Sequence, residues 1–214
     1  MPAVRLLWDL ANRLAAAVAL LFLLPAVLAV ALWIRIADGR GVLFVQERAG
    51  RGGAPFRMWK FRTMVHDSVA MSARLGLADP FGLVENDPRI TRCGRFLRRT
   101  SLDEIPQLVN VVRGQMWLVG PRPDVLPQVA NYSPEDARRL EVKPGITGWA
   151  QINGREDIDW QQRFVLDRWY VDNWSPALDL RILWRTVATL RRDEPPVHLD
   201  TINIQRAQDV RRAA

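Results

Sequence analysis

The sequence is poor in the residues that cross-link chains or bind transition metals. Cys93 is the single cysteine among 214 residues, so no disulfide can form within the chain, and only His66 and His198 could join it as metal ligands. A structural zinc site needs four such ligands, which excludes one here. We therefore expect the soluble part of the protein in a reducing compartment.

Acidic residues are fewer than basic ones. Thirty Lys and Arg oppose 23 Asp and Glu, which gives a formal net charge of +7 and an isoelectric point near 10.8. Such a surplus attracts polyanions, including phosphates, anionic lipids and nucleic acids. The length suffices for one membrane element and one compact soluble domain, but not for two large domains.

One long hydrophobic run is present near the N-terminus. Residues 14–34 carry no charge and match the roughly 20 residues with which a helix crosses the hydrocarbon core. Pro25 lies near the middle of this run, and the arginines on both flanks draw both ends towards the cytoplasm. We predict a re-entrant membrane helix over residues 1–36, kinked at Pro25. An ordinary kinked transmembrane helix and a cleaved signal peptide remain alternatives.

The rest of the chain predicts a small α+β catalytic domain, mostly helical, over residues 37–192. Residues 41–48 and 55–64 are β-rich and are separated by a glycine-rich turn, which predicts a β-hairpin. A polar C-terminal tail is predicted over residues 193–214.

The last part of this domain is rich in tryptophan and arginine. Residues 157–192 predict two helices that are broken near Ser175 and Pro176. Amphipathic helices of this composition suit a membrane interface. The same tryptophans could instead fill the core of a small domain, and the sequence leaves both interpretations open.

Two neighbouring acids, Asp103 and Glu104, follow an arginine-rich segment. The apolar residues between Ser101 and Val112 recur at helical spacing, which places Asp103 opposite the apolar stripe, while Pro106 indicates an irregular first turn. Ser101 and Glu104 also match a capping box, in which both side chains would only satisfy backbone groups.

These residues also suit chemistry on phosphate. An aspartate that attacks phosphorus forms an acyl phosphate and splits one transfer into two steps. Cations must offset the charge of the phosphoryl oxygens, and the nearby arginines together with Lys60 could supply them. Glu104 could hold Mg²⁺, which prefers oxygen ligands.

Four ordered motifs make the chain resemble the bacterial sugar transferase family, the small monotopic polyprenyl-phosphate phosphoglycosyl transferases. The resemblance extends from about Arg5 to Trp184. The motifs are Lys60-Phe61-Arg62-Thr63-Met64, the run from Arg98 to Leu108 that contains Ser101-Leu102-Asp103-Glu104, Gly120-Pro121-Arg122-Pro123, and Lys143-Pro144-Gly145-Ile146-Thr147-Gly148-Trp149-Ala150-Gln151.

The resemblance implies an enzyme of the bacterial inner membrane whose catalytic domain lies on the cytoplasmic face. It would transfer a sugar phosphate from a UDP-sugar to undecaprenyl (polyprenyl) phosphate, the first membrane step of exopolysaccharide or glycoconjugate assembly. Asp103 would attack the β-phosphate, expel UMP and form a sugar-phospho-aspartate, which the acceptor then attacks. Glu104 would bind Mg²⁺. The candidate phosphate-binding residues are Lys60, Arg62, Arg98 and Arg122.

Two other classes of protein compete with this interpretation. A non-catalytic membrane scaffold of an envelope-polysaccharide complex would need none of this chemistry. A membrane-tethered nucleic-acid-binding module would use the charge of +7, but Asp103 and Glu104 beside the arginines would weaken contacts with a phosphate backbone. We therefore expect membrane lipid and the two substrates as partners, no nucleic acid, and leave a homo-oligomer open.

Overall fold

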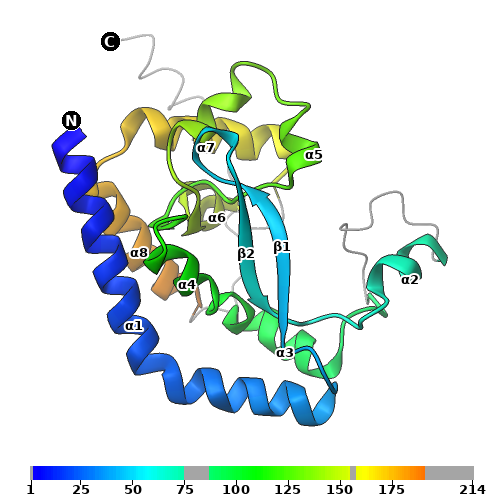
Figure 1. The fold of residues 1–214 in the computed structure, drawn as a ribbon. Helices are drawn as coiled ribbons and strands as arrows, with labels where there is room; N and C mark the ends of the chain where they lie inside the picture. The colour runs from blue at the N-terminus through cyan, green and yellow to red at the C-terminus, as the bar shows by residue number, and fades with distance from the viewer. Residues whose placement is uncertain (1, 75–86, 155–157, 191–214) are drawn as a thin grey trace. The chain divides into compact units, whose positions relative to one another are not determined.

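The computed structural model describes residues 2–74, 87–154 and 158–190 (Figure 1). The predicted tail over residues 193–214 lies outside this part of the chain. The backbone divides into two compact units. Unit 1 is drawn from Met1–Ala16, Glu47–Arg57 and Asn110–Ala214, and unit 2 from Ala17–Gln46 and Met58–Val109.

The hydrophobic run forms a single helix, α1, over Pro2–Ala37, with Pro25 inside it. Within the described residues, Ala3–Ala37 is the one helix long and apolar enough to cross a membrane. Many of its large side chains are exposed, including Leu21 and Phe22. The predicted long apolar helix is therefore confirmed, while its re-entrant path stays a prediction.

The predicted β-hairpin is also confirmed. Strands β1 (Leu43–Ala49) and β2 (Pro55–Phe61) form a two-stranded sheet, and Figure 1 shows them side by side. A 3-10 turn over Arg51–Gly53 joins them. Gly52 and Gly53 adopt φ values of 67° and 77°, which glycine reaches without steric cost. The glycine-rich segment thus serves as the turn of the hairpin.

Unit 2 places helix α3 (Arg92–Arg99) against an extended segment around Thr63. Thr91 caps the helix by accepting a hydrogen bond from the backbone N–H of Gly94, and its own backbone N–H donates to the carbonyl of Thr63 at 3.0 Å. A Cβ atom added at Gly94 would lie 2.0 Å from the carbonyl oxygen of Thr63. Only glycine therefore allows α3 to lie this close.

A buried core and a short helix complete unit 2. Its core consists of Ile34, Phe61 and Leu97, all at most 2% exposed. Helix α2 (Ser68–Arg74) is fastened by the buried guanidinium of Arg89, whose Nη1 donates to the Ser72 hydroxyl at 2.5 Å.

The segment around Asp103 differs from its predicted form. Leu102–Glu104 is a 3-10 turn, and helix α4 begins only at Gln107 and ends at Val112, so the predicted irregularity near Pro106 is confirmed. The capping box is wrong, because Ser101 makes no side-chain cap and adopts the left-handed conformation at φ 56°. The predicted position of Asp103 opposite an apolar helical stripe is also wrong, because the residue lies in this 3-10 turn and is 8% exposed.

Unit 1 is built around a small parallel sheet. Strands β3 (Trp117–Val119) and β4 (Gly145–Thr147) pair in parallel, with Trp117 opposite Gly145 and Val119 opposite Thr147. The other elements of this unit are α5 (Leu126–Val129), a 3-10 helix at Asp136–Glu141, α6 (Trp149–Gly154), α7 (Trp160–Asn173) and α8 (Pro176–Leu190). The described residues therefore confirm a mostly helical α+β fold.

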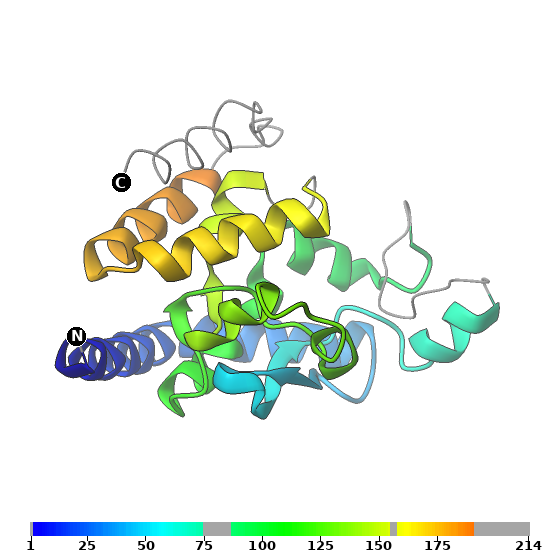
Figure 2. The same cartoon turned by 90° about the horizontal axis from the view of Figure 1, so that it is seen from above.

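The break between the last two helices lies where the sequence predicts it. Figure 2 shows α7 and α8 as separate helices joined by a short turn. Their tryptophans fall into both predicted classes. Trp174 stacks on the buried Trp117 with ring centroids 5.6 Å apart, whereas Trp184 is 78% exposed. Core packing is therefore confirmed for Trp174, while a membrane-interface role for the exposed Trp184 stays a prediction.

The first residues of α1 make polar contacts within unit 1. Asp9 accepts hydrogen bonds from the Trp117 indole at 2.8 Å and from the Lys143 ammonium. Trp8 donates its indole N–H to Asp179 at 2.7 Å. Polar side chains thus fasten the start of an otherwise apolar helix to the unit that contains the sheet.

Candidate active site

The predicted site residues fall in both units. Unit 2 holds Lys60, Arg62, Arg98, Asp103 and Glu104, and unit 1 holds Arg122. The surroundings of each group are therefore described within its own unit.

Lys60 and Glu104 form the central ion pair of unit 2. The Nζ atom of Lys60, on strand β2, lies 2.8 Å from Oε1 of Glu104, and the two side chains are 15% and 16% exposed. A bond between a cation and a carboxylate is stronger than a neutral hydrogen bond, more so where water is largely excluded. The pair ties the strand motif to the turn that contains Asp103.

A second contact joins the same two motifs. The Nε atom of Arg98, in the last turn of α3, donates to the Thr63 hydroxyl at 2.9 Å. The close approach that Gly94 permits brings α3 within reach of this hydroxyl. Two motifs whose contacting residues are 35 and 44 positions apart therefore meet in unit 2, and Asp103, next to Glu104, is 8% exposed.

Arg62 has a different environment from Lys60. Its guanidinium is 6% exposed, donates to the Asp38 carbonyl at 2.8 Å and contacts Nε2 of His66. His66 in turn lies 2.7 Å from the carbonyl of Arg40. These contacts fasten the segment that follows α1, so a role for Arg62 in binding phosphate stays a prediction without direct support from its position.

In unit 1 the two remaining motifs are joined through their backbones. The backbone N–H of Gly120 donates to the Thr147 carbonyl at 2.9 Å, and that of Gly145 donates to the Pro121 carbonyl at 3.0 Å. A Cβ atom at Gly145 would lie 2.0 Å from the nitrogen of Gly120. Glycine is therefore required for the contact that positions the loop carrying Arg122.

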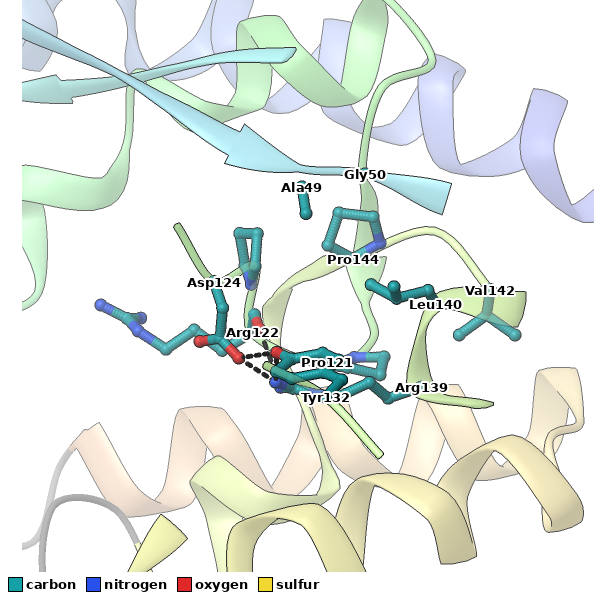
Figure 3. Close-up of a pocket in the computed structure, with 11 residues that line it drawn as sticks. Ala49, Gly50, Pro121, Arg122, Asp124, Tyr132, Arg139, Leu140, Val142 and Pro144 are labelled. Atoms are coloured by element: carbon teal, nitrogen blue, oxygen red, sulfur yellow. Dashed lines mark hydrogen bonds and ion pairs between the residues drawn. The ribbon is translucent and has the colours of Figure 1, made fainter. Parts of the chain in front are cut away.

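A buried arginine organises the same loop (Figure 3). Arg139 is 3% exposed and donates to the Arg122 carbonyl at 3.0 Å, to the Tyr132 hydroxyl at 2.6 Å and to Asp167 at 2.5 Å, and it forms an ion pair with Asp124. Burial by itself lowers the pKa of Arg139, but the carboxylates of Asp167 and Asp124 outweigh that effect and raise it. The cation is therefore permanent.

Arg122 and Arg163 add positive charge close to this cluster. Figure 3 shows the Arg122 side chain extending away from Arg139 and Tyr132. Burial lowers the pKa of Arg163, and the positive charge of Arg122 lowers it further. The carboxylates of Asp124 and Asp167 act in the opposite direction and raise the pKa of Arg163.

Sequence reasoning missed most of the Arg139 cluster. Asp124 directly follows the Gly120-Pro121-Arg122-Pro123 motif and was within reach of that reasoning. Arg139, Asp167 and Arg163 lie outside the four motifs, and no local spacing connects them, because the chain folds back between them.

The described residues offer carboxylates for the predicted Mg²⁺ but no cluster of three or more ligands. No group of three or more His, Cys, Asp or Glu side chains that could hold a metal occurs within the described residues. Mg²⁺ that acts on phosphates is commonly bound by one or two carboxylates, with waters and substrate oxygens completing its shell. Glu104, the predicted ligand, supplies one such carboxylate.

Comparisons with known proteins match most of the chain. The family described as bacterial sugar transferase matches residues 4–193. The sugar transferase EpsL of Bacillus subtilis (strain 168) is 48% identical over 154 residues, which make up 72% of this chain and 72% of that protein.

The names of two further relatives state substrates. The undecaprenyl-phosphate galactose phosphotransferase of Salmonella typhimurium is 41% identical over 184 residues, 81% of this chain and 39% of that protein. The UDP-glucose:undecaprenyl-phosphate glucose-1-phosphate transferase of Escherichia coli (strain K12) is 39% identical over 194 residues, 86% of this chain and 40% of that protein. The chain thus spans about two fifths of the length of these two relatives.

Proposed function

Because the chain belongs to the bacterial sugar transferase family, we propose that it transfers a sugar phosphate from a UDP-sugar to undecaprenyl phosphate. The products are UMP and a polyprenyl-diphosphate-linked sugar. The printed names of the Salmonella and Escherichia relatives support the acceptor, and that of the Escherichia relative supports the donor. The observation that carries the proposal is the buried Asp103 in a turn whose Glu104 is paired with Lys60 of a second motif.

Asp103 is the proposed nucleophile. In the first step one carboxylate oxygen forms a bond to the β-phosphorus of the donor, and the bond from that phosphorus to the oxygen of UMP breaks. UMP leaves with the electron pair, and a sugar-phospho-aspartate remains. The turn conformation holds the carboxylate in place, because Ser101 before it adopts a left-handed backbone that does not continue α3.

The acceptor completes the reaction in a second step. A phosphate oxygen of undecaprenyl phosphate attacks the same phosphorus, and the bond to the aspartate oxygen breaks, which regenerates the Asp103 carboxylate. Both steps bring anions together, so fixed cations lower the barrier. Lys60 and Arg98 supply positive charge in unit 2, and Arg122 supplies it in unit 1.

Glu104 is the proposed ligand of Mg²⁺, with Asp103 beside it. The ion, when bound, neutralises charge on the phosphoryl oxygens. Lys60 holds the Glu104 carboxylate in one orientation through its 2.8 Å contact, so this lysine is a positioning residue in the proposal.

We place the protein at the bacterial inner membrane with its catalytic domain on the cytoplasmic face, and α1 as a re-entrant helix. The exposed apolar side chains of α1, its internal Pro25 and the basic residues at both ends support this topology. Single cysteines at positions 4 and 45, in a Cys93→Ser background, should both be protected from an impermeant thiol reagent in intact cells. Labelling of position 4 alone would contradict the re-entrant path.

The direct test of the function measures which nucleotide is released. Purified protein in detergent is incubated with Mg²⁺, undecaprenyl phosphate and a panel of UDP-sugars. We expect UMP from the wild type and none from Asp103→Asn, whose amide is a poor nucleophile of similar shape. A matched control is Asp136→Asn, which changes an acid of unit 1 outside the proposed site.

The outcomes separate the competing functions. Release of UDP would mean that sugar moves without its phosphate, which contradicts the proposed chemistry. Release of UMP by Asp103→Asn at the wild-type rate would remove Asp103 as the nucleophile. No nucleotide from any donor would favour the non-catalytic scaffold.

A further inference from the structure

We propose that the rings of Tyr132, Trp160 and Phe164 form a subsite that binds the base of a nucleoside phosphate. The guanidinium groups of Arg163 and Arg122 bind the phosphates beside it. This inference rests on the proposed function, since a nucleotide donor is part of that function, and it concerns unit 1 alone.

A cavity lies beside these rings. It has a volume of about 290 Å³ and is lined by Gln128, Asn131, Tyr132, Trp160 and Phe164. That volume lies at the lower end of the roughly 300–1,000 Å³ of ligand pockets. The cavity beside the Arg139 cluster in Figure 3 measures about 10 Å³, which is space for one water at most. A substrate group therefore fits only the aromatic cavity of these two.

The three aromatic rings meet edge to face, and the ring of Trp160, with the Arg163 guanidinium over it, is about half exposed. Tyr132 and Phe164 have centroids 5.2 Å apart at 69°, and Trp160 and Phe164 have centroids 5.8 Å apart at 60°. Trp160 is 47% exposed although it is a large apolar ring at the start of α7. Such a ring beside a cavity is a stacking surface for a flat heterocycle.

Positive charge lies directly beside this surface. The Arg163 guanidinium is 5.1 Å from the centroid of the Trp160 ring. The charge of Arg122 acts on Arg163, as its lowered pKa indicates, although burial is the larger cause. A phosphate is the anion that paired guanidiniums bind best.

The cavity favours a nucleoside over the other phosphate-bearing substrate. The amides of Gln128 and Asn131 contribute both donors and acceptors to its wall. Asn131 is held in place because its Nδ2 donates to the Pro127 carbonyl at 2.9 Å. The amides can form hydrogen bonds with the polar edge of a pyrimidine base, whereas an isoprenoid chain has no group that could form them.

The test measures binding of UMP, which requires no turnover. Full-length protein in detergent is titrated with UMP, uridine and inorganic phosphate by equilibrium dialysis. Trp160→Leu should weaken UMP and uridine binding by roughly 5- to 150-fold, and leave inorganic phosphate unchanged. Arg163→Gln should weaken UMP and inorganic phosphate roughly tenfold or more, and leave uridine unchanged.

Two matched variants guard against misfolding. Trp160→Phe keeps a ring and should restore UMP binding to within a few-fold of the wild type. Trp184→Leu removes an equally large ring that is 78% exposed on α8 and should change nothing. Wild-type affinity for UMP in Trp160→Leu would overturn the proposal, as would Trp160-dependent displacement of UMP by undecaprenyl phosphate, since the cavity would then hold the acceptor.

Failure of the subsite and failure of the function give different results. UMP binding that depends on Trp160, without UMP release from any UDP-sugar, would support the subsite and contradict the transferase function. Normal UMP release by Trp160→Leu, with an unchanged KM for the donor, would support the transferase function and contradict the subsite.

Discussion

Replacement of Arg139 by methionine should be among the most destabilising substitutions in unit 1. The side chain is 3% exposed and contacts Asp124 and Asp167, which are 5% and 1% exposed. Without the arginine, two carboxylates remain buried and lack their cation. Removal of one partner from a buried ion pair costs about 3–5 kcal/mol. That is a large part of the roughly 5–15 kcal/mol that stabilises a typical domain.

The physical cause can be isolated with a compensated variant. Arg139→Met combined with Asp124→Asn and Asp167→Asn removes the buried cation together with its two carboxylates. We expect this triple variant to recover part of the lost stability, because the two carboxylates no longer stay buried without their cation. The stability of Arg139→Lys should lie between that of the wild type and that of Arg139→Met. Lysine keeps the charge but loses the two-pronged geometry with which a guanidinium binds carboxylates.

The assay is reversible unfolding of the full chain in detergent, followed by tryptophan fluorescence in urea. Arg139→Met should lower the midpoint far more than Arg138→Met, a neighbouring control whose side chain is 39% exposed. The reasoning would be refuted if Arg139→Met cost less than about 1 kcal/mol, the size of an exposed pair. It would also fail if the triple variant were less stable than the single one, because buried charge would then not be the cause.

Two further predictions concern other carboxylates. Burial raises the pKa of Asp179 to about 6, despite hydrogen bonds from Tyr170 and Trp8, so its contribution to stability is complete below the unfolded pKa of about 4 and is lost as the pH rises through 6. Between pH 4 and 7 the free energy of unfolding of the wild type should fall by about 3 kcal/mol relative to that of Asp179→Asn. Urea midpoints of the two proteins that change in parallel with pH would contradict this. In a double-mutant cycle, Lys60→Met and Glu104→Gln should each destabilise the chain by about 1–3 kcal/mol and couple by at least about 0.5 kcal/mol; additive losses would show that the 2.8 Å pair contributes nothing.

Local signals in the sequence predicted the elements that local chemistry determines. The glycines at positions 50, 52 and 53 mark the hairpin turn, and Ser175-Pro176 marks the end of α7, since proline cannot continue a helix. Apolar composition alone predicted α1. These elements were correctly predicted because turn formation and helix termination depend on neighbouring residues.

The turn at Asp103 could not be predicted in this way. Periodicity places Leu102, Ile105 and Leu108 on one helical face, but the left-handed Ser101 ends the preceding helix and the chain enters a 3-10 turn instead. Serine has no intrinsic preference for that conformation. Contacts distant in sequence, such as Lys60 with Glu104, stabilise the turn, and no single-sequence pattern encodes a partner 44 residues away.

Membership of a family motif does not by itself identify a residue that contacts substrate. Lys60 and Arg62 stand two residues apart in one motif, yet Lys60 contacts the acidic turn, whereas Arg62 is buried against the backbone that follows α1. Gly145 belongs to another motif and serves only close backbone approach. Arg163 lies in no motif, yet its charge acts near that of Arg122. Phosphate binding should therefore be tested residue by residue, beginning with Arg122, whose side chain extends away from Arg139 and Tyr132 in Figure 3.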